Sequence, residues 1–193
     1  GGGWGQEAEC CILPPPFPRT LKMQMTNNVN YFDCRLRPCA LTPTGADLTK
    51  LSIVNQDIQG SFPSELSVMT KLKEFSLFNL KLTGALPAWL STLTLLTRLE
   101  VYGNKLSSSI PSQLAYLSKL RILRLDRNAL RGSLPSELGM LSEVTGVQLN
   151  DNELSGTLPG SLSLLSKAST FYLNNAGDLC RNSTVSVVDK CSQ

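Results

Sequence analysis

The sequence contains no histidine, and aromatic residues make up only 6% of its 193 residues. Without histidine the chain lacks the commonest general base near neutral pH and the commonest metal ligand. Serine–histidine–aspartate, cysteine–histidine and histidine–zinc chemistries are therefore excluded. No pair of acidic residues lies in a recognisable catalytic motif. The sequence predicts a protein that is not an enzyme and that has no cofactor and no metal site.

Excess charge and long apolar segments are also missing. The formal net charge is only +3, and no run of like charge reaches five residues. This balance argues against nucleic acid as a partner. No stretch approaches the roughly 18 apolar residues of a membrane span, so none is expected in this chain. The chain begins at Gly1 instead of a methionine and a signal peptide, as a processed or trimmed product would.

Cysteine is absent between residues 40 and 179 but present near both ends. The six residues are Cys10, Cys11, Cys34, Cys39, Cys180 and Cys191. An even number of cysteines that flank a domain is typical of disulfides formed in an oxidising compartment, which predicts an extracellular location. A zinc site is the competing interpretation, but Cys34 and Cys39 lack a second pair at zinc-ligand spacing and a histidine.

The central part of the chain repeats one pattern at a fixed step of 24 residues. The segments 123–135 and 147–159 show it most clearly. The same step separates Pro63, Pro87, Pro111, Pro135 and Pro159, and it separates Gly60, Gly84, Gly132 and Gly156, with Ser108 in the third glycine place. A step that never slips predicts stacked coils of equal size.

Each unit combines two apolar patterns. Leu123 and Leu125 alternate with polar residues, which predicts a short strand with one buried face. Leu138, Leu141 and Val144 recur at three-residue spacing, which suits a helical or 3₁₀ turn on an outer wall. One coil cannot bury both sets, so the core must form between stacked coils.

These units resemble the plant-type extracellular leucine-rich repeat, LxxLxxLxLxxNxLxGxIPxxLxxL, over residues 48 to about 176. The resemblance implies an α/β solenoid, a right-handed superhelix with a concave parallel β-sheet and short 3₁₀ or α-helices on the convex side. It also implies disulfide caps at both ends. We therefore divide the chain into an N-terminal arm and cap (1–47), six coils of which the last is partial (48–176), and a C-terminal cap (177–193).

In this family an asparagine after the strand bonds to backbone groups of neighbouring coils and forms a ladder. Asn104, Asn128 and Asn152 match it, as structural rather than ligand-binding residues. Gln56, Leu80 and Ala176 depart from the pattern, so we expect the ladder to be incomplete at both ends and at the second coil.

The resemblance also suggests how the caps are closed. Cys180 followed by Cys191 is similar to the disulfide-closed end of plant-type repeat proteins. At the other end the adjacent Cys10 and Cys11 are expected to bond Cys34 and Cys39, and either crossing is possible. The family's tryptophan-glycine-valine motif is missing there, so an algal or protist source is as plausible as a land plant.

One acceptor motif for N-glycosylation, Asn182-Ser183-Thr184, lies in the C-terminal cap. In an extracellular protein we expect Asn182 to carry a glycan. An unmodified exposed loop is the alternative.

Alternation along six strands also predicts which side chains line the concave sheet. Phe78 and Tyr102 should lie side by side in neighbouring coils, close to charged residues. The predicted binding residues are Phe78, Arg98, Glu100, Tyr102, Arg124 and Asp126. Exposed aromatics beside arginine are typical of binding hot spots. The alternative is that these charges pair across coils and the aromatics cover edges of the core.

The family resemblance implies recognition without catalysis. We expect a secreted or cell-surface module that binds a protein or glycan ligand through its concave face. A structural subunit of an extracellular assembly, with self-association, is the alternative. Ice binding is a lesser one, based on a column of small residues at Ser61, Ala85, Ser109, Ser133 and Thr157. Gln59 and Arg131 in the next column interrupt any flat, repetitive surface.

Overall fold

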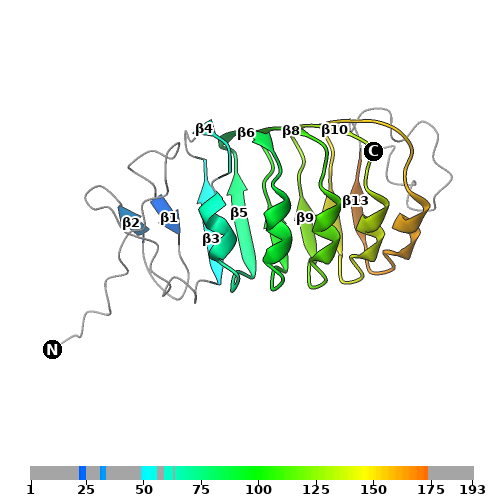
Figure 1. The fold of residues 1–193 in the computed structure, drawn as a ribbon, viewed down its shortest axis with the longest axis horizontal. Coiled ribbons are helices and arrows are strands. Elements are labelled where there is room, and N and C mark those ends of the chain that lie inside the picture. Colours follow the sequence, from blue (N-terminus) through cyan, green and yellow to red (C-terminus); the bar gives the residue numbers. More distant parts are fainter. Residues whose placement is uncertain (1–21, 25–30, 34–48, 56–58, 63, 174–193) are drawn as a thin grey trace.

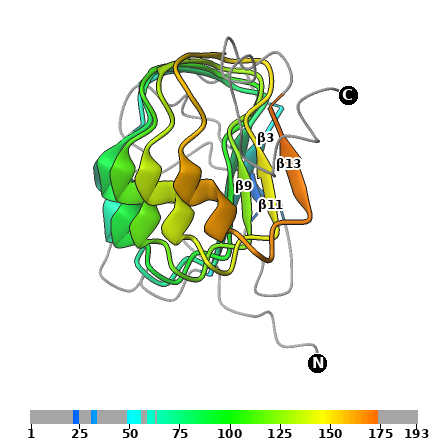
Figure 2. The ribbon, with the colours of Figure 1, turned by 90° about the vertical axis from the view of Figure 1, so that its right-hand side faces the viewer.

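The computed structural model describes residues 22–24, 31–33, 49–55, 59–62 and 64–173. Within these ranges the chain winds into a solenoid whose coils each pass from a strand, through a short second strand, to a 3₁₀ helix on the opposite wall (Figures 1 and 2). The predicted fold class, a leucine-rich-repeat solenoid, is confirmed.

The concave wall is a sheet whose coil strands are all parallel. Equivalent residues of adjacent coils pair directly, so Leu99 is opposite Leu123 and Val147 is opposite Phe171. The six coil strands are β3 (Lys50–Val54), β5 (Glu74–Phe78), β7 (Arg98–Glu100), β9 (Ile122–Arg124), β11 (Gly146–Gln148) and β13 (Thr170–Tyr172). Two antiparallel strands, β1 (Lys22–Gln24) and β2 (Tyr31–Asp33), extend the sheet beyond β3. Sequence analysis did not predict this extension.

A second parallel sheet lies along one edge of the solenoid and was also not predicted. Its strands are β4 (Gln59–Gly60), β6 (Lys81–Ala85), β8 (Lys105–Ser108), β10 (Ala129–Gly132) and β12 (Glu153–Leu154). Here partners are 22 residues apart, as for Gly84 and Leu106, instead of the 24 of the concave sheet. The second strands of neighbouring coils are therefore offset by two residues.

The repeated glycine lies in this second sheet because the backbone there is left-handed. Gly84 and Gly132 have φ of 81° and 78°, a region that glycine enters without steric cost. Ser108 takes the same conformation, with φ of 76°, although its Cβ makes this region sterically unfavourable.

Within the described part of the chain, five 3₁₀ helices form the convex wall, as the three-residue spacing predicted. They are η2 (Ser64–Val68), η3 (Ala88–Thr92), η4 (Ser112–Tyr116), η5 (Ser136–Met140) and η6 (Gly160–Leu164). A proline precedes each helix from η3 to η6, and its carbonyl accepts the first turn's hydrogen bond, as from Leu90 N to Pro87 O at 3.2 Å. Proline suits this place because its φ is fixed and no N–H is needed there.

Leucines from both walls fill the interior, and buried asparagines connect the coils. Asn104 donates to the carbonyls of Leu77 (2.8 Å) and Val101 (3.0 Å) and accepts from Leu82 N (3.2 Å). Asn128 and Asn152 repeat this arrangement one and two coils further on. In the second coil the same place holds Leu80, which is buried and apolar. The second coil therefore contributes no side-chain amide to the ladder at this position.

Several sequence predictions lie outside the described residues. They concern the cysteines Cys10, Cys11, Cys34, Cys39, Cys180 and Cys191, the acceptor Asn182, and the ladder positions Gln56 and Ala176. Among the helices that the structure does describe, none has the length and apolar character needed to span a bilayer.

Candidate functional site

The concave sheet presents its side chains in three rows that run from coil to coil. The first row is Lys50, Glu74, Arg98, Ile122, Gly146 and Thr170, and the second is Ser52, Ser76, Glu100, Arg124, Gln148 and Tyr172. The third row begins with Val54 and Phe78 in register and continues, at the same 24-residue step, through Tyr102, Asp126 and Asn150. All six predicted binding residues belong to these rows.

An aromatic stack stands at the centre of the site. The rings of Phe78 and Tyr102 lie 4.4 Å apart between centroids and nearly parallel, at 12°. The guanidinium of Arg124 covers the Tyr102 ring, with Cζ 3.8 Å from its centroid. We call Phe78, Tyr102 and Arg124 the aromatic step. Both rings are only half-buried, so they remain accessible from the concave side.

Burial raises the pKa of the Tyr102 phenol above its ordinary value of 10, and the positive charge of Arg124 partly opposes this shift. The phenol is therefore neutral at physiological pH. It offers a hydrogen-bond donor at the rim of an otherwise apolar ring.

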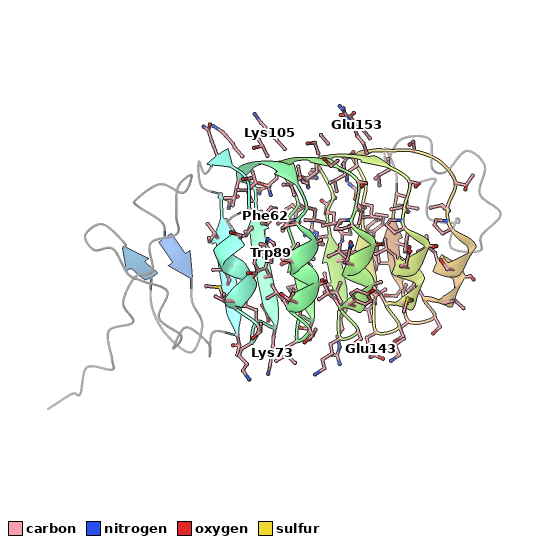
Figure 3. All side chains as sticks on the ribbon, in the orientation of Figure 1. Phe62, Lys73, Trp89, Lys105, Glu143 and Glu153 are labelled. Atoms are coloured by element: carbon pink, nitrogen blue, oxygen red, sulfur yellow. The ribbon has the colours of Figure 1, made fainter. Side chains whose placement is uncertain are left out.

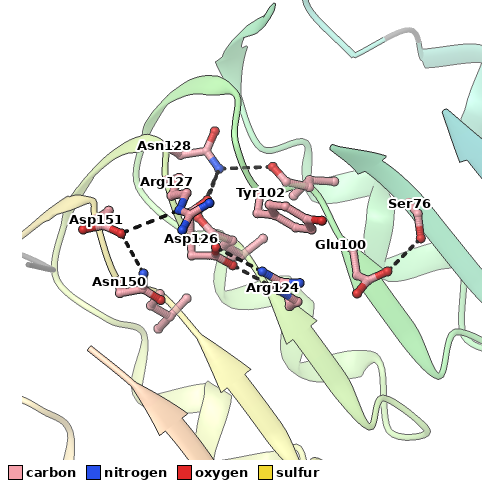
Figure 4. A network of polar contacts seen from close by, with 12 residues as sticks. Ser76, Glu100, Tyr102, Arg124, Asp126, Arg127, Asn128, Asn150 and Asp151 are labelled. Atoms are coloured by element: carbon pink, nitrogen blue, oxygen red, sulfur yellow. Dashed lines mark hydrogen bonds and ion pairs between the residues drawn. The ribbon is translucent and has the colours of Figure 1, made fainter. Parts of the chain in front are cut away.

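Charged residues around the step pair mainly within their own coils. Arg98 contacts Glu100 at 3.2 Å. Arg124 contacts Asp126 through two nitrogens, both at 3.3 Å (Figure 4). Between coils, Ser76 donates to Glu100 at 3.0 Å. These bonds hold the arginines in fixed positions on the sheet.

The structure corrects the expected role of Asp126. Its residue is only 2% exposed, so its carboxylate cannot meet a partner directly. The residues that hold the same place in the neighbouring coils, Tyr102 and Asn150, are only half-buried, so the repeat alone does not predict the burial of Asp126. Asp126 instead positions Arg124 over Tyr102.

The C-terminal part of the concave face differs in character, and sequence analysis missed its main feature. A hollow of about 130 Å³ opens over β9, β11 and β13. It is lined by Ile122, Arg124, Thr145, Gly146, Gln148, Ser169 and Thr170. Gly146 belongs to the first row, in which all the other coils carry a side chain. A glycine inside a strand often marks a place where the surface is left open.

In the ranges that the structure describes, no three potential metal-binding side chains gather together. The concave face presents aromatic, arginine, hydroxyl and amide groups.

Comparison with known proteins identifies the repeats. The family model for the Leucine Rich Repeat matches residues 95–117 and 119–141, which are two successive coils. The chain is built of leucine-rich repeats similar to those of plant receptor ectodomains. No curated protein matches this leucine-rich-repeat chain in sequence.

Solved structures of plant ectodomains are similar to this leucine-rich-repeat protein. The Arabidopsis receptor kinase HAESA, in complex with the peptide hormone IDA and a co-receptor, is 30% identical with a TM-score of 0.67 over 69% of this chain and 23% of that one. The plant peptide hormone receptor RGFR1, in complex with RGF2, is 32% identical with the same TM-score over 69% of this chain and 21% of that one. A plant ice-binding protein is 31% identical with a TM-score of 0.60, over 67% and 42%. The chain thus spans under a quarter of the two receptor chains.

Proposed function

We propose that this protein is an extracellular, non-catalytic recognition module that binds a segment of a partner protein or peptide across its concave face. The observation that supports this most directly is the aromatic step. Two half-buried rings and a guanidinium held by a buried carboxylate form a rigid surface that needs little ordering on binding.

The neighbours support the same function. HAESA and RGFR1 were both solved with peptide hormones, and the receptor setting of HAESA supports an extracellular or cell-surface location for this chain. Disulfides at both ends and a glycan on Asn182 belong to this proposal as well.

The proposal can be tested with a displayed library of random short peptides selected against the whole chain. Recovered peptides are then titrated against Tyr102→Ala and against Tyr116→Ala, which removes a tyrosine that is 64% exposed on the convex wall. We expect Tyr102→Ala to weaken binding by about tenfold or more and Tyr116→Ala to leave it unchanged. Equal binding to both variants, or no peptide recovered, would contradict the proposal.

A structural subunit is the second candidate, and an exposed apolar row on the convex wall favours it. Val68, Tyr116, Met140 and Leu164 occupy the same place in their coils and are each more than 60% exposed. Rows of this kind often mark contacts between proteins. Light scattering of the native chain and of Met140→Gln/Leu164→Gln tests this function. A concentration-dependent mass that falls in the double variant supports it, and a native monomer at all concentrations excludes it.

Ice binding receives less support even though one similar structure is of an ice-binding protein. Along the second sheet the ion pair between Arg131 and Glu153, at 2.8 Å, projects next to the column of small residues. Lys105 and Glu153 extend from the same edge (Figure 3). These long charged side chains break up the flat surface that ice binding requires, and a thermal hysteresis measurement would detect the activity directly.

A further inference from the structure

The hollow at Gly146 is open because one side chain is missing. A Cβ placed on Gly146 would lie 3.2 Å from Cδ1 of Ile122 and 4.0 Å from Cβ of Thr170. Any larger side chain would therefore occupy the space between these two neighbours. The backbone of Gly146 is not left-handed, so the local conformation does not require glycine.

The walls of the hollow combine apolar and polar groups, and the charge of their one cation is balanced by a neighbouring acid. Its lining includes no carboxylate of its own, and the one cation, Arg124, is already paired with Asp126. The Thr145 hydroxyl donates to Arg121 O at 3.1 Å, which leaves its oxygen able to accept a further bond. Gln148 adds an amide that can both donate and accept. The site offers hydrogen bonds of both kinds to an uncharged ligand.

Size and hydration narrow the class of ligand. At about 130 Å³ the hollow is large enough to hold several water molecules. A ligand that displaces such water must replace its hydrogen bonds or lose affinity. An aliphatic side chain cannot do so, whereas a ring that carries several hydroxyl groups can.

An exposed aromatic ring stands beside the hollow. Tyr172 is 43% exposed and pairs in register with Gln148, which lines the hollow. A tyrosine combines an apolar ring face with a polar tip, so it can pack against the C–H face of a sugar while neighbouring groups bond its hydroxyls.

We propose that the hollow over Gly146, flanked by Tyr172, binds one neutral sugar ring of a glycan. The hollow shares Arg124 with the aromatic step but includes neither Phe78 nor Tyr102, so sugar binding is a separate proposal from the peptide-binding function above.

The test is an NMR titration of the whole chain with glucose, galactose, mannose and xylose, observed at backbone amides. We expect at least one sugar to shift the amides of Gly146, Gln148 and Thr170 with an affinity in the millimolar range. Gly146→Val should abolish these shifts by filling the hollow, and a β-branched residue suits a strand. Tyr172→Ala should weaken binding severalfold, while Tyr116→Ala, on the convex wall, should leave it unchanged.

Variants that retain the wild-type spectrum elsewhere are informative, and Gln148→Leu provides a second probe of the same hollow should Gly146→Val fail to fold. The proposal is overturned when no sugar shifts these amides, or when a well-folded Gly146→Val still binds. Salt-sensitive binding of glucuronate at least about tenfold tighter than glucose would also overturn it, since an anion site would then be present. Loss of peptide binding in Gly146→Val without any sugar binding would assign the hollow to the peptide instead.

Discussion

Asp126 lies buried behind Arg124 and accepts two hydrogen bonds from its guanidinium, both at 3.3 Å. The acid therefore contributes to recognition only through the arginine that it holds over Tyr102. A partner would contact Tyr102 and Arg124 but not Asp126.

Substitutions of Arg124 and Asp126 should therefore have non-additive effects on the free energy of unfolding in a double-mutant cycle. Arg124→Met should lower the free energy of unfolding by about 2–3 kcal/mol, because it leaves the Asp126 carboxylate buried without its partner. Adding Asp126→Asn should recover part of that loss, because the buried charge is then gone. Urea unfolding of the single and double variants measures the coupling. Strictly additive effects would show that the two side chains act independently.

Because the ladder asparagines bond buried backbone groups, shortening one of them to alanine should lower the stability of the protein strongly. Asn152 bonds the carbonyls of Leu125 and Leu149 and the N–H of Leu130, all within 3.0 Å. Asn152→Ala leaves Leu149 O and Leu130 N–H without the amide that bonds them, while Leu125 O keeps its bond from Asn128. The change should destabilise the protein by about 2–3 kcal/mol in chemical unfolding. Asn150→Ala, two residues earlier and facing the concave side, serves as the control and should cost under about 0.5 kcal/mol. Similar losses in both variants would contradict an inter-coil role for Asn152.

Backbone strain at Ser108 predicts a stabilising substitution. Ser108 has φ of 76° where the equivalent coils carry glycine. Ser108→Gly should raise the free energy of unfolding by about 1 kcal/mol and raise the Tm accordingly. The reverse change, Gly132→Ser, should lower it by a similar amount, since a Cβ there meets nothing closer than 3.7 Å and only the strain is altered. An unchanged Tm in both variants would show that the strain is absent.

Two glycines of the convex wall should respond oppositely to alanine. A Cβ on Gly139 would lie only 2.3 Å from the carbonyl oxygen of Ser161 in the next coil, so η5 and η6 would have to separate. Gly139→Ala should cost about 1–3 kcal/mol. Gly160→Ala meets nothing within 4 Å and should be neutral or stabilising by up to about 1 kcal/mol. Thermal unfolding of both variants tests this difference. Equal melting temperatures would contradict the close approach of Gly139 to Ser161.

The repeat, the strands and the 3₁₀ helices could be predicted from the sequence, because a constant step of 24 residues leaves each coil one way to pack on the next. The same regularity predicted that Phe78 and Tyr102 are neighbours, and which coils would carry the asparagine amide. These features depend on local periodicity and on the constant pairing of residues 24 apart in neighbouring coils.

The burial and the contacts of individual side chains, in contrast, could be learned only from the three-dimensional structure. Asp126 is buried and paired with Arg124, whereas Tyr102 and Asn150 are half-buried in the same place of the neighbouring coils, a difference that two-residue alternation does not encode. The second sheet pairs residues 22 apart because its short strands are offset between coils. The hollow at Gly146 depends on side chains from three coils at once. Each of these features arises from packing between coils, where three-dimensional distances and not sequence spacing determine which groups meet.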